Sequence, residues 1–295
     1  MNLTFTRAAA QEMADRYSSK FPNDNDDALP AFRTIHSFCG GEILPLLRKR
    51  NFPMPQSVWD TDKLRNQVEM SKDTSDSEDD YNKTREPDKE SVTSYTIMKA
   101  VLAHFKLSRK DESIKEKISG VITSIKNRQL KPSEYEEKVL VIDKKEYGVK
   151  DIYDTYQKEL DKHHCMDYDD VLYYSLLGLK KYPDILRQLQ SKYVYWSIDE
   201  AQDNSTLHNE LLSLLVGDQG NLFVVGDDDQ SIYYFRGAEP RLLLDYGLQD
   251  NVKTMVMGTN YRSGSYIVNM AKSFIEENIC RADKQMQPNP TAGLG

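Results

Sequence analysis

Four short runs of apolar and β-branched or aromatic residues are spaced along the chain, and segments with helical spacing separate them. The runs lie at residues 3–6, 193–198, 222–225 and 252–257, and each ends at polar residues or glycine. Runs of this length with such boundaries are typical of buried strands. Because helical segments alternate with them, we expect an α/β fold with a parallel sheet and helices on its faces.

Two of the helical segments flank these strands directly. Residues 8–17 are good helix formers that follow the first run without a gap. A second helix follows the run at 193–198, and either Asn204 or Ser205 is placed to cap its start. Its apolar stripe consists of Leu207, Leu211, Leu214 and Leu215.

The region at residues 46–160 has a different pattern. It predicts a largely helical module, without a strong buried strand, that interrupts the α/β sequence. One helix is indicated by an apolar face opposite lysines, and a second is expected at residues 151–160. Residues 71–90 contain few apolar side chains and the acidic block DTSDSEDD at 73–80, so we expect a disordered insertion there. The apolar face comprises Ile114, Ile118, Val121, Ile122 and Ile125.

Composition narrows the class of protein only moderately. The 295 residues suffice for one large or two modest domains, with 39% hydrophobic and 29% charged residues. The apolar stretches are too short to span a bilayer, and the start lacks a signal-peptide pattern. Three distant cysteines, Cys39, Cys165 and Cys280, suggest reduced structural thiols, and we expect a cytoplasmic protein.

The net charge of −8 argues against a protein that coats nucleic acid electrostatically. The acid is not evenly spread, however: residues 73–80 form a local acidic block, and outside it the balance of acidic and basic residues is closer to neutral. Net charge therefore neither supports nor excludes DNA binding.

Acidic residues follow two of the predicted strands. Asp199 and Glu200 come directly after the run at 193–198, where open α/β sheets bind ligands. One carboxylate of such a pair can hold Mg²⁺ while the other accepts a proton from an attacking water. An Asp-Glu pair is also common at a solvated strand end, and that alternative stays open for the pair taken alone.

The strand at 222–225 ends in the segment GDDDQSIYYFRGA. Gln230 in this segment could orient water or contact a terminal phosphate. Tyr233 and Phe235 offer flat faces for base stacking, worth about 1–3 kcal/mol per base. The alternative for these aromatic side chains is core packing.

Six segments in this order resemble the motifs of UvrD/Rep/PcrA-type superfamily 1A DNA helicases. VVGDDDQSIYYFRGA (224–238) is similar to motif III and SIDEAQD (197–203) to motif II. LTFTRAAAQEM (3–13) resembles motif Ia, TIHSFC (34–39) motif Ib and NYRS (260–263) motif IV. MDYDDVL (166–172) resembles the segment that re-enters the first motor domain. Together they extend over nearly the whole chain.

The resemblance implies a RecA-like sheet, interrupted by the helical subdomain 1B at 46–160. Residues 1–45 and 161–250 would form motor domain 1A, and 251–295 would begin domain 2A. Asp199 would coordinate Mg²⁺, and Glu200 would activate the hydrolytic water. Gln230 would sense the γ-phosphate of ATP, and Arg262 would act as an arginine finger. Relatives touch single-stranded DNA at the positions of Phe5, His36, Tyr233, Phe235 and Arg236, where Phe235 replaces a usual tryptophan.

No G-x-x-x-x-G-K-[ST] phosphate-binding loop occurs in the sequence. The family places that loop, and the strand before it, ahead of motif Ia, and motifs V and VI after motif IV. We therefore expect a fragment of an ATP-dependent DNA helicase, of 3′-to-5′ polarity, acting on single-stranded DNA or single/double-strand junctions. A partner chain could supply the missing motor parts. The alternative is a non-catalytic module that binds single-stranded DNA or a partner.

Overall fold

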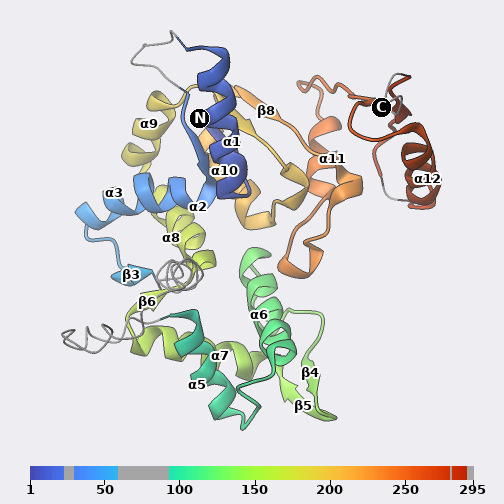
Figure 1. Ribbon diagram of the computed structural model, residues 1–295. Coiled ribbons are helices and arrows are strands. Elements are labelled where there is room, and N and C mark those ends of the chain that lie inside the picture. The colour runs from blue at the N-terminus through green and yellow to red at the C-terminus, as the bar shows by residue number, and fades with distance from the viewer. Residues whose placement is uncertain (23–29, 59–92, 280, 291–295) are drawn as a thin grey trace, which may run out of the picture.

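The computed structural model describes residues 1–22, 30–58, 93–279 and 281–290. Its elements form an upper part built around a parallel sheet and a lower part rich in helices (Figure 1). The predicted disordered insertion at 71–90 and Cys280 lie outside the described residues.

The sheet has four parallel strands in the order β2-β1-β7-β8. They are β1 (Asn2–Thr4), β2 (Phe32–Thr34), β7 (Trp196–Ile198) and β8 (Leu222–Val224). The prediction that the runs at 3–6, 193–198 and 222–225 share a parallel sheet is confirmed. β2 was not predicted, because only one of its three residues (FRT) has a strongly apolar side chain.

Two helices connect neighbouring strands, and both begin at a side-chain cap. Helix α1 (Arg7–Lys20) joins β1 to β2, and the Thr6 side chain accepts a hydrogen bond from the Ala9 amide. Helix α10 (Thr206–Val216) joins β7 to β8, and its cap is Ser205 rather than Asn204. The chain leaves β1 toward one side of the sheet and continues from β7 toward the other. Ligands of open α/β sheets bind at the carboxyl ends of strands where the order reverses in this way, here β1 and β7.

The main hydrophobic core lies between this sheet and five helices. Leu3, Trp196 and Ile198 of the sheet are buried against them, and the Phe38 ring meets the Trp196 ring edge-on at 5.5 Å. The molecule is therefore a mixed α/β protein with a parallel sheet. The helices are α2 (Ile35–Phe38), α3 (Leu44–Lys49), α8 (Tyr168–Lys181), α9 (Pro183–Lys192) and α10. A π-helical turn, Cys39–Ile43, links α2 to α3.

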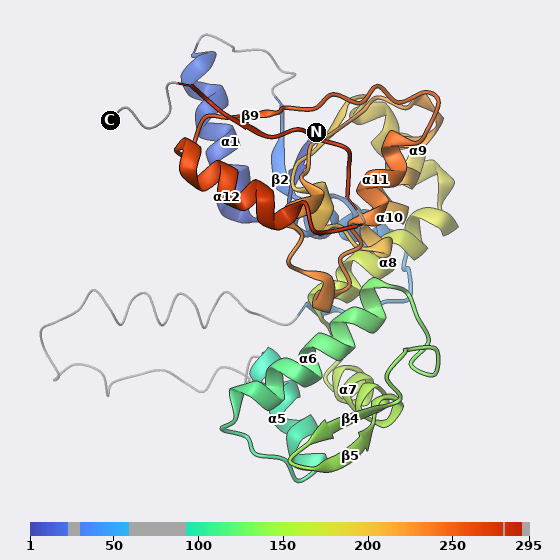
Figure 2. The ribbon, with the colours of Figure 1, turned by 90° about the vertical axis from the view of Figure 1, so that its right-hand side faces the viewer.

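A second core belongs to the lower part, which lies below the sheet in both ribbon views (Figures 1 and 2). It contains α5 (Ser94–His104), α6 (Glu112–Asn127) and α7 (Val149–Lys162). It also contains an antiparallel hairpin of β4 (Val139–Ile142) and β5 (Lys145–Gly148), which was not predicted. Exposed and buried residues alternate along β4, so neither strand is a strongly buried one. Only Leu140 and Ile142 of β4 point inward, and both turn residues, Asp143 and Lys144, have positive φ without the usual Asn-Gly signal.

The run at 252–257, predicted to be a buried strand, is not a strand in the structure. Met255 and Met257 are 75% and 77% exposed. An apolar run becomes a strand only when a neighbour takes its hydrogen bonds, and no described strand pairs with this run. The adjacent elements are α11 (Arg241–Gly247), β9 (Thr259–Asn260), α12 (Ser265–Ile275) and β10 (Gln287–Pro288), which pairs with β9.

One further short pair, β3 (Ser57–Val58) and β6 (Cys165–Met166), runs parallel beneath the main core. Among the described residues, every helix falls short of the length and apolar character needed to cross a membrane.

Candidate functional site

The carboxyl end of β7 carries the predicted acidic pair. The Asp199 amide donates to the carbonyl of Leu3 at 2.9 Å, which continues the ladder between β7 and β1. Glu200 follows in the left-handed region at φ 55°, an uncommon conformation for a residue other than glycine. Such backbone outliers concentrate at functional sites.

Gln202, which sequence analysis did not single out, connects Glu200 to the end of β8. Its Nε2 donates to Oε2 of Glu200 at 2.8 Å, and its Oε1 accepts the Asp227 amide hydrogen at 3.0 Å. A side chain at Gly226 would bring its Cβ to 2.8 Å from that Oε1, so glycine allows this close approach. Gln202 lies within the motif II segment (197–203), and this position is the sequence signal that could have identified it.

Gln230 lies at the same edge of the sheet. Its Nε2 donates to Oδ2 of Asp227 at 2.6 Å, so Glu200, Gln202, Asp227 and Gln230 form one hydrogen-bonded series. Gln230 does not bond Glu200 directly. Its exposed side chain leaves it accessible to a ligand at this edge.

Burial affects the carboxyl groups of this edge. It raises the pKa of Asp199, with a further contribution from the charge of Glu200. It also raises the pKa of Asp203 to about 6, again with help from Glu200. Oδ1 of Asp203 is buried and has no hydrogen-bond partner among the described residues.

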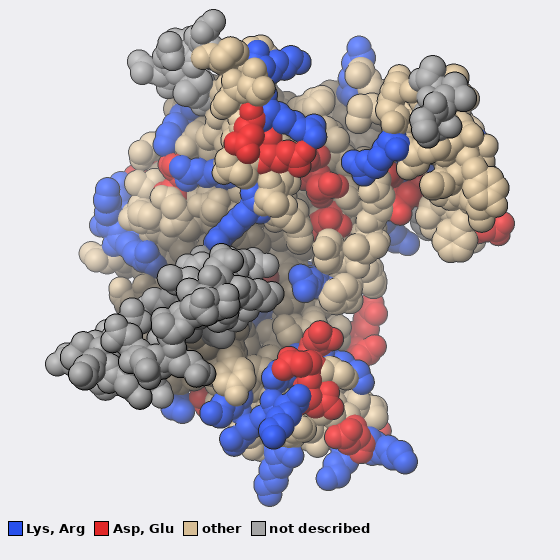
Figure 3. Space-filling view, viewed as in Figure 1, with Lys and Arg blue, Asp and Glu red and all other residues tan. Residues whose placement is uncertain are grey.

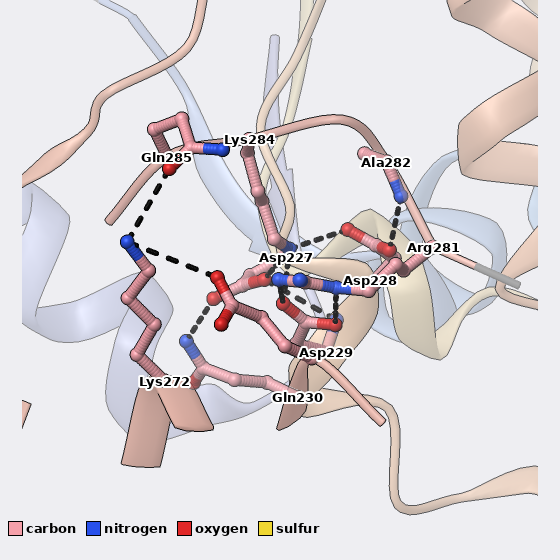
Figure 4. Close-up of polar contacts among 10 residues, drawn as sticks. Asp227, Asp228, Asp229, Gln230, Lys272, Arg281, Ala282, Lys284 and Gln285 are labelled. Atoms are coloured by element: carbon pink, nitrogen blue, oxygen red, sulfur yellow. Dashed lines mark hydrogen bonds and ion pairs between the residues drawn. The ribbon is translucent and has the colours of Figure 1, made fainter. Parts of the chain in front are cut away.

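Three consecutive aspartates after β8 place ligand oxygens within 4.8 Å of one another, a geometry compatible with a cation. The structure pairs them with the segment after α12 instead (Figure 4). Lys284 contacts Asp227 and bonds Asp228 at 2.5 Å, and Arg281 Nη2 donates to Asp229 Oδ2 at 2.6 Å. These two cations offset two of the three negative charges of the aspartates.

Carboxylate oxygens at a strand end are suitable ligands for Mg²⁺, so the donor chemistry of Asp199 fits this ion, whereas both oxygens of Asp227 are engaged by Lys284 and Gln230. The fit to a nucleotide is incomplete. The sequence contains no phosphate-binding loop, and Lys284 and Arg281 are already engaged by aspartates. The edge as described can thus orient a metal and a water but supplies no cradle for β- and γ-phosphates.

The Arg262 side chain makes no hydrogen bond or ion pair with the described residues of this edge. Its side chain is exposed, and its backbone amide donates to Oδ1 of Asn260 at 2.9 Å. The Ser263 amide donates to the same oxygen, which fixes a turn before α12.

All five residues predicted to contact DNA line one open cleft of about 1260 Å³ between the sheet and α6. The rings of Phe5 and Tyr233 are stacked with centroids 5.3 Å apart, and Phe235 lies 6.3 Å beyond Tyr233. The Arg236 guanidinium lies 5.6 Å from the centre of Tyr233 and 5.5 Å from that of Phe235. Phe235 is 60% exposed, which excludes the core-packing alternative for this side chain.

His36 lies deeper in the cleft. Its ring meets those of Tyr168 and His208 edge-on at 5.9 and 5.6 Å. Burial lowers the pKa of His36 to about 4, although the charge of Asp167 opposes this shift. His36 is therefore a neutral ring at neutral pH and offers a hydrogen bond or a flat face to a ligand.

A buried charged cluster lies behind the cleft, where α6 meets the start of α8. Nζ of Lys126 lies 2.7 Å from carboxylate oxygens of both Asp167 and Asp170. Burial alone would lower the pKa of Lys126, but the two carboxylates outweigh burial and raise it. Burial raises the pKa of Asp169 to about 7, and the charge of Asp167 adds to this shift.

The face in Figure 3 carries Lys and Arg intermixed with Asp and Glu over the lower part. A uniform positive surface is therefore not the basis of recognition on this face. The fold and the site define a parallel-sheet α/β protein whose acidic strand ends adjoin an aromatic cleft.

The chain belongs to the UvrD/REP helicase family, because the family model for the UvrD/REP helicase N-terminal domain matches residues 1–249. ATP-dependent DNA helicase PcrA of Bacillus subtilis (strain 168) is 29% identical over 301 residues, which cover 99% of this chain and 35% of that protein. PcrA of Leuconostoc citreum is 31% identical over 65% of this chain and 25% of its own length. PcrA of Staphylococcus aureus (strain Mu50 / ATCC 700699) is 31% identical over 59% of this chain and 24% of its own. The chain thus spans about a third of the B. subtilis relative.

Proposed function

We propose that this chain is part of an ATP-dependent DNA helicase that couples ATP hydrolysis to 3′-to-5′ movement along single-stranded DNA. The observation that carries this proposal is the segment after β8, which serves both regions of the site. Asp227 and Gln230 lie at the acidic edge, while Tyr233, Phe235 and Arg236 line the cleft a few residues further on. A change at a nucleotide bound to the edge would thus be transmitted directly to stacked bases.

Within this function, each side chain at the edge has one task. Asp199 holds Mg²⁺, and Glu200 accepts the proton of the attacking water, with Gln202 fixing its carboxylate. Gln230 contacts the γ-phosphate. Bound ATP would supply the phosphoryl group on which these residues act.

The remaining parts follow the same proposal. Residues 1–45 and 161–250 form motor domain 1A, residues 46–160 form subdomain 1B, and residues 251–295 begin domain 2A. Arg262 serves as an arginine finger, which requires the segment around α12 to approach the edge, since Arg262 is exposed in the structure.

The missing phosphate-binding loop would come with an additional strand. β8 is the last strand of the described sheet on its side, and Phe223 within it is 64% exposed. A further parallel strand on β8 would place its own side chains beside Phe223 and deliver its loop beside Gln230. Additional sequence of the same protein or a partner chain could provide it.

A second candidate function is a non-catalytic module that binds single-stranded DNA or a partner. The pairing of Asp227, Asp228 and Asp229 with Lys284 and Arg281 favours it, because these cations occupy the acidic group.

The test is equilibrium binding of a fluorescein-labelled oligothymidine to residues 1–295, measured by anisotropy with and without ATP and Mg²⁺. Residues 1–295 contain no phosphate-binding loop, so the helicase proposal predicts DNA affinity that changes with ATP and Mg²⁺ once that loop is supplied, in the same chain or by a partner chain. DNA binding that is insensitive to nucleotide would support the binding module. A chain that folds but binds no single-stranded DNA would contradict the proposed DNA site.

A further inference from the structure

We propose that Asn127, at the end of α6, is a positioning residue that fixes the loop carrying Tyr233, Phe235 and Arg236 for DNA stacking. This inference rests on the proposed function of that loop. According to this inference, the lower, helical part of the molecule controls the geometry of the aromatic row, which consists of Phe5, Tyr233 and Phe235.

Asn127 is only 5% exposed and bonds to three different elements. Its Nδ2 donates to the backbone carbonyl of Arg236 at 3.2 Å and to Oδ1 of Asp169 at 3.1 Å. Its Oδ1 accepts from the hydroxyl of Ser205, the cap of α10, at 3.2 Å. One buried side-chain amide thus joins α6, α8 and the start of α10 to the loop that carries Tyr233, Phe235 and Arg236.

The contact at Gly237 shows how closely the loop lies on α6. Gly237 has φ +87°, and an added Cβ would come within 2.9 Å of Cβ of Asn127 and 3.5 Å of the Ser124 backbone. The loop backbone therefore lies directly on the helix. Because it is held there, the side chain of Phe235 can remain exposed without the loop moving away.

Arg128 adds a second contact next to Asn127. Its guanidinium lies 4.6 Å from the centre of the Tyr234 ring, and its Nε is 3.9 Å from Oε1 of Glu239. Both partners lie on the segment that Asn127 anchors. Gln129, one residue further, bonds instead to Glu210 of α10 at 2.6 Å.

This arrangement separates positioning from general stability. Lys126 holds α6 against α8 through the buried charges of Asp167 and Asp170, so its loss would affect the whole assembly. Asn127→Ala leaves that ion pair in place and removes the donor to the loop, together with the bonds to Asp169 and Ser205. The aromatic side chains remain present, but their backbone is no longer fixed.

The experiment is a double-mutant cycle on residues 1–295, read by anisotropy with labelled oligothymidine. We expect Asn127→Ala to weaken DNA binding about fivefold, the effect of one lost hydrogen bond. In a chain that already carries Phe235→Ala, the same change should weaken binding less than twofold, because the Phe235 ring that Asn127 positions is then absent. Gln129→Gly is the matched control. This substitution removes a side-chain amide that bonds to Glu210 and not to the loop, and glycine tolerates the positive φ at position 129. DNA binding should therefore be unchanged.

Hydrogen exchange without DNA provides an independent readout. Asn127→Ala should accelerate exchange of the Gly237 and Ala238 amides, which donate to Tyr234 and Tyr233, while amides of α10 keep their protection. Gly237→Ala should reproduce the loss of DNA affinity from the other side of the contact.

Each alternative outcome overturns the inference. Unchanged affinity, additive losses with Phe235→Ala, or loss of cooperative melting in Asn127→Ala would show that Asn127 does not act through the loop. If the unmodified chain binds no DNA, the proposed function fails. The exchange measurement would then still decide whether Asn127 fixes the loop.

Discussion

Gln202 donates a hydrogen bond from its Nε2 to Oε2 of Glu200 at 2.8 Å, from a fully buried position. Its Oε1 simultaneously accepts the amide hydrogen of Asp227, so a single side chain joins the ends of β7 and β8. The orientation of the proposed general base therefore depends on the segment that carries Gln230. This link gives a direct physical path from one strand end to the other.

Gln202→Ala should lower the free energy of unfolding by about 1–3 kcal/mol, because the Asp227 amide loses its acceptor and Glu200 loses a donor at a buried position. Gln230→Ala is the matched control. Its side chain is exposed and makes one bond to Asp227, so the change should stay within about 0.5 kcal/mol. Urea denaturation followed by circular dichroism measures both, and equal effects would argue against the bridging role of Gln202.

The purified chain should show negligible DNA-stimulated ATP hydrolysis. Loss of a single positioned donor can cost about 10²–10³ in rate, and the sequence lacks the whole phosphate-binding loop and its lysine. Phosphate release with and without oligothymidine tests this expectation. Robust hydrolysis that disappears in Glu200→Gln would show that other residues supply the phosphate cradle.

Strand-then-acid patterns at residues 193–200 and 222–230 were sufficient to predict the parallel sheet and the shared edge. They did not by themselves reveal Gln202, because its hydrogen bonds depend on the close approach of Gly226, which follows β8 in the chain. The hairpin β4–β5 was not predicted because its turn, Asp143-Lys144, has positive φ at both residues but lacks the glycine that usually marks such a turn. The run at 252–257 failed as a strand because hydrophobicity alone does not provide a hydrogen-bonding neighbour. Asn127 lay on a helix whose apolar face was evident, but its partners are distant in sequence.

Asp169→Asn should change how stability depends on pH. Burial raises the pKa of Asp169 from 3.8 to about 7, so the folded chain binds this proton more tightly than the unfolded chain. The stabilisation is complete below pH 3.8 and is lost as pH rises to about 7. Asparagine stays neutral, so the stability of the variant relative to the unmodified chain should increase from pH 5 to pH 8.

The measurement is a pair of melting curves at each pH. The pKa values of His36 and His208 are lowered, so these residues make the folded state more stable as pH rises in the acid range. This effect is the same in the variant and the unmodified chain, and it cancels when their stabilities are subtracted. A difference independent of pH would mean that Asp169 is ionised throughout.

Gly178→Ala should destabilise the main core. An added Cβ would lie 2.2 Å from Cδ1 of Leu47, which is fully buried on α3. Overpacking of this kind costs about 1–3 kcal/mol. At Gly40, by contrast, no atom lies within 4 Å of the added Cβ, so Gly40→Ala serves as the control. Equal melting temperatures for the two variants would show that α3 and α8 can separate at little cost.

Phe235→Ala should weaken binding of single-stranded DNA by about 1–3 kcal/mol, because it removes one stacking platform from the aromatic row. Phe235 is 60% exposed, so the variant should retain the melting temperature of the unmodified chain. Stacking releases no counterions, and the salt dependence of binding should therefore stay the same. Arg236→Ala is a poorer probe, since its guanidinium lies over both Tyr233 and Phe235 and its loss alters the row itself. Anisotropy at several salt concentrations measures the loss of affinity and its salt dependence, and a melting curve measures the stability of the variant. Unchanged DNA affinity in a stably folded Phe235→Ala variant would show that this side chain does not belong to the DNA site.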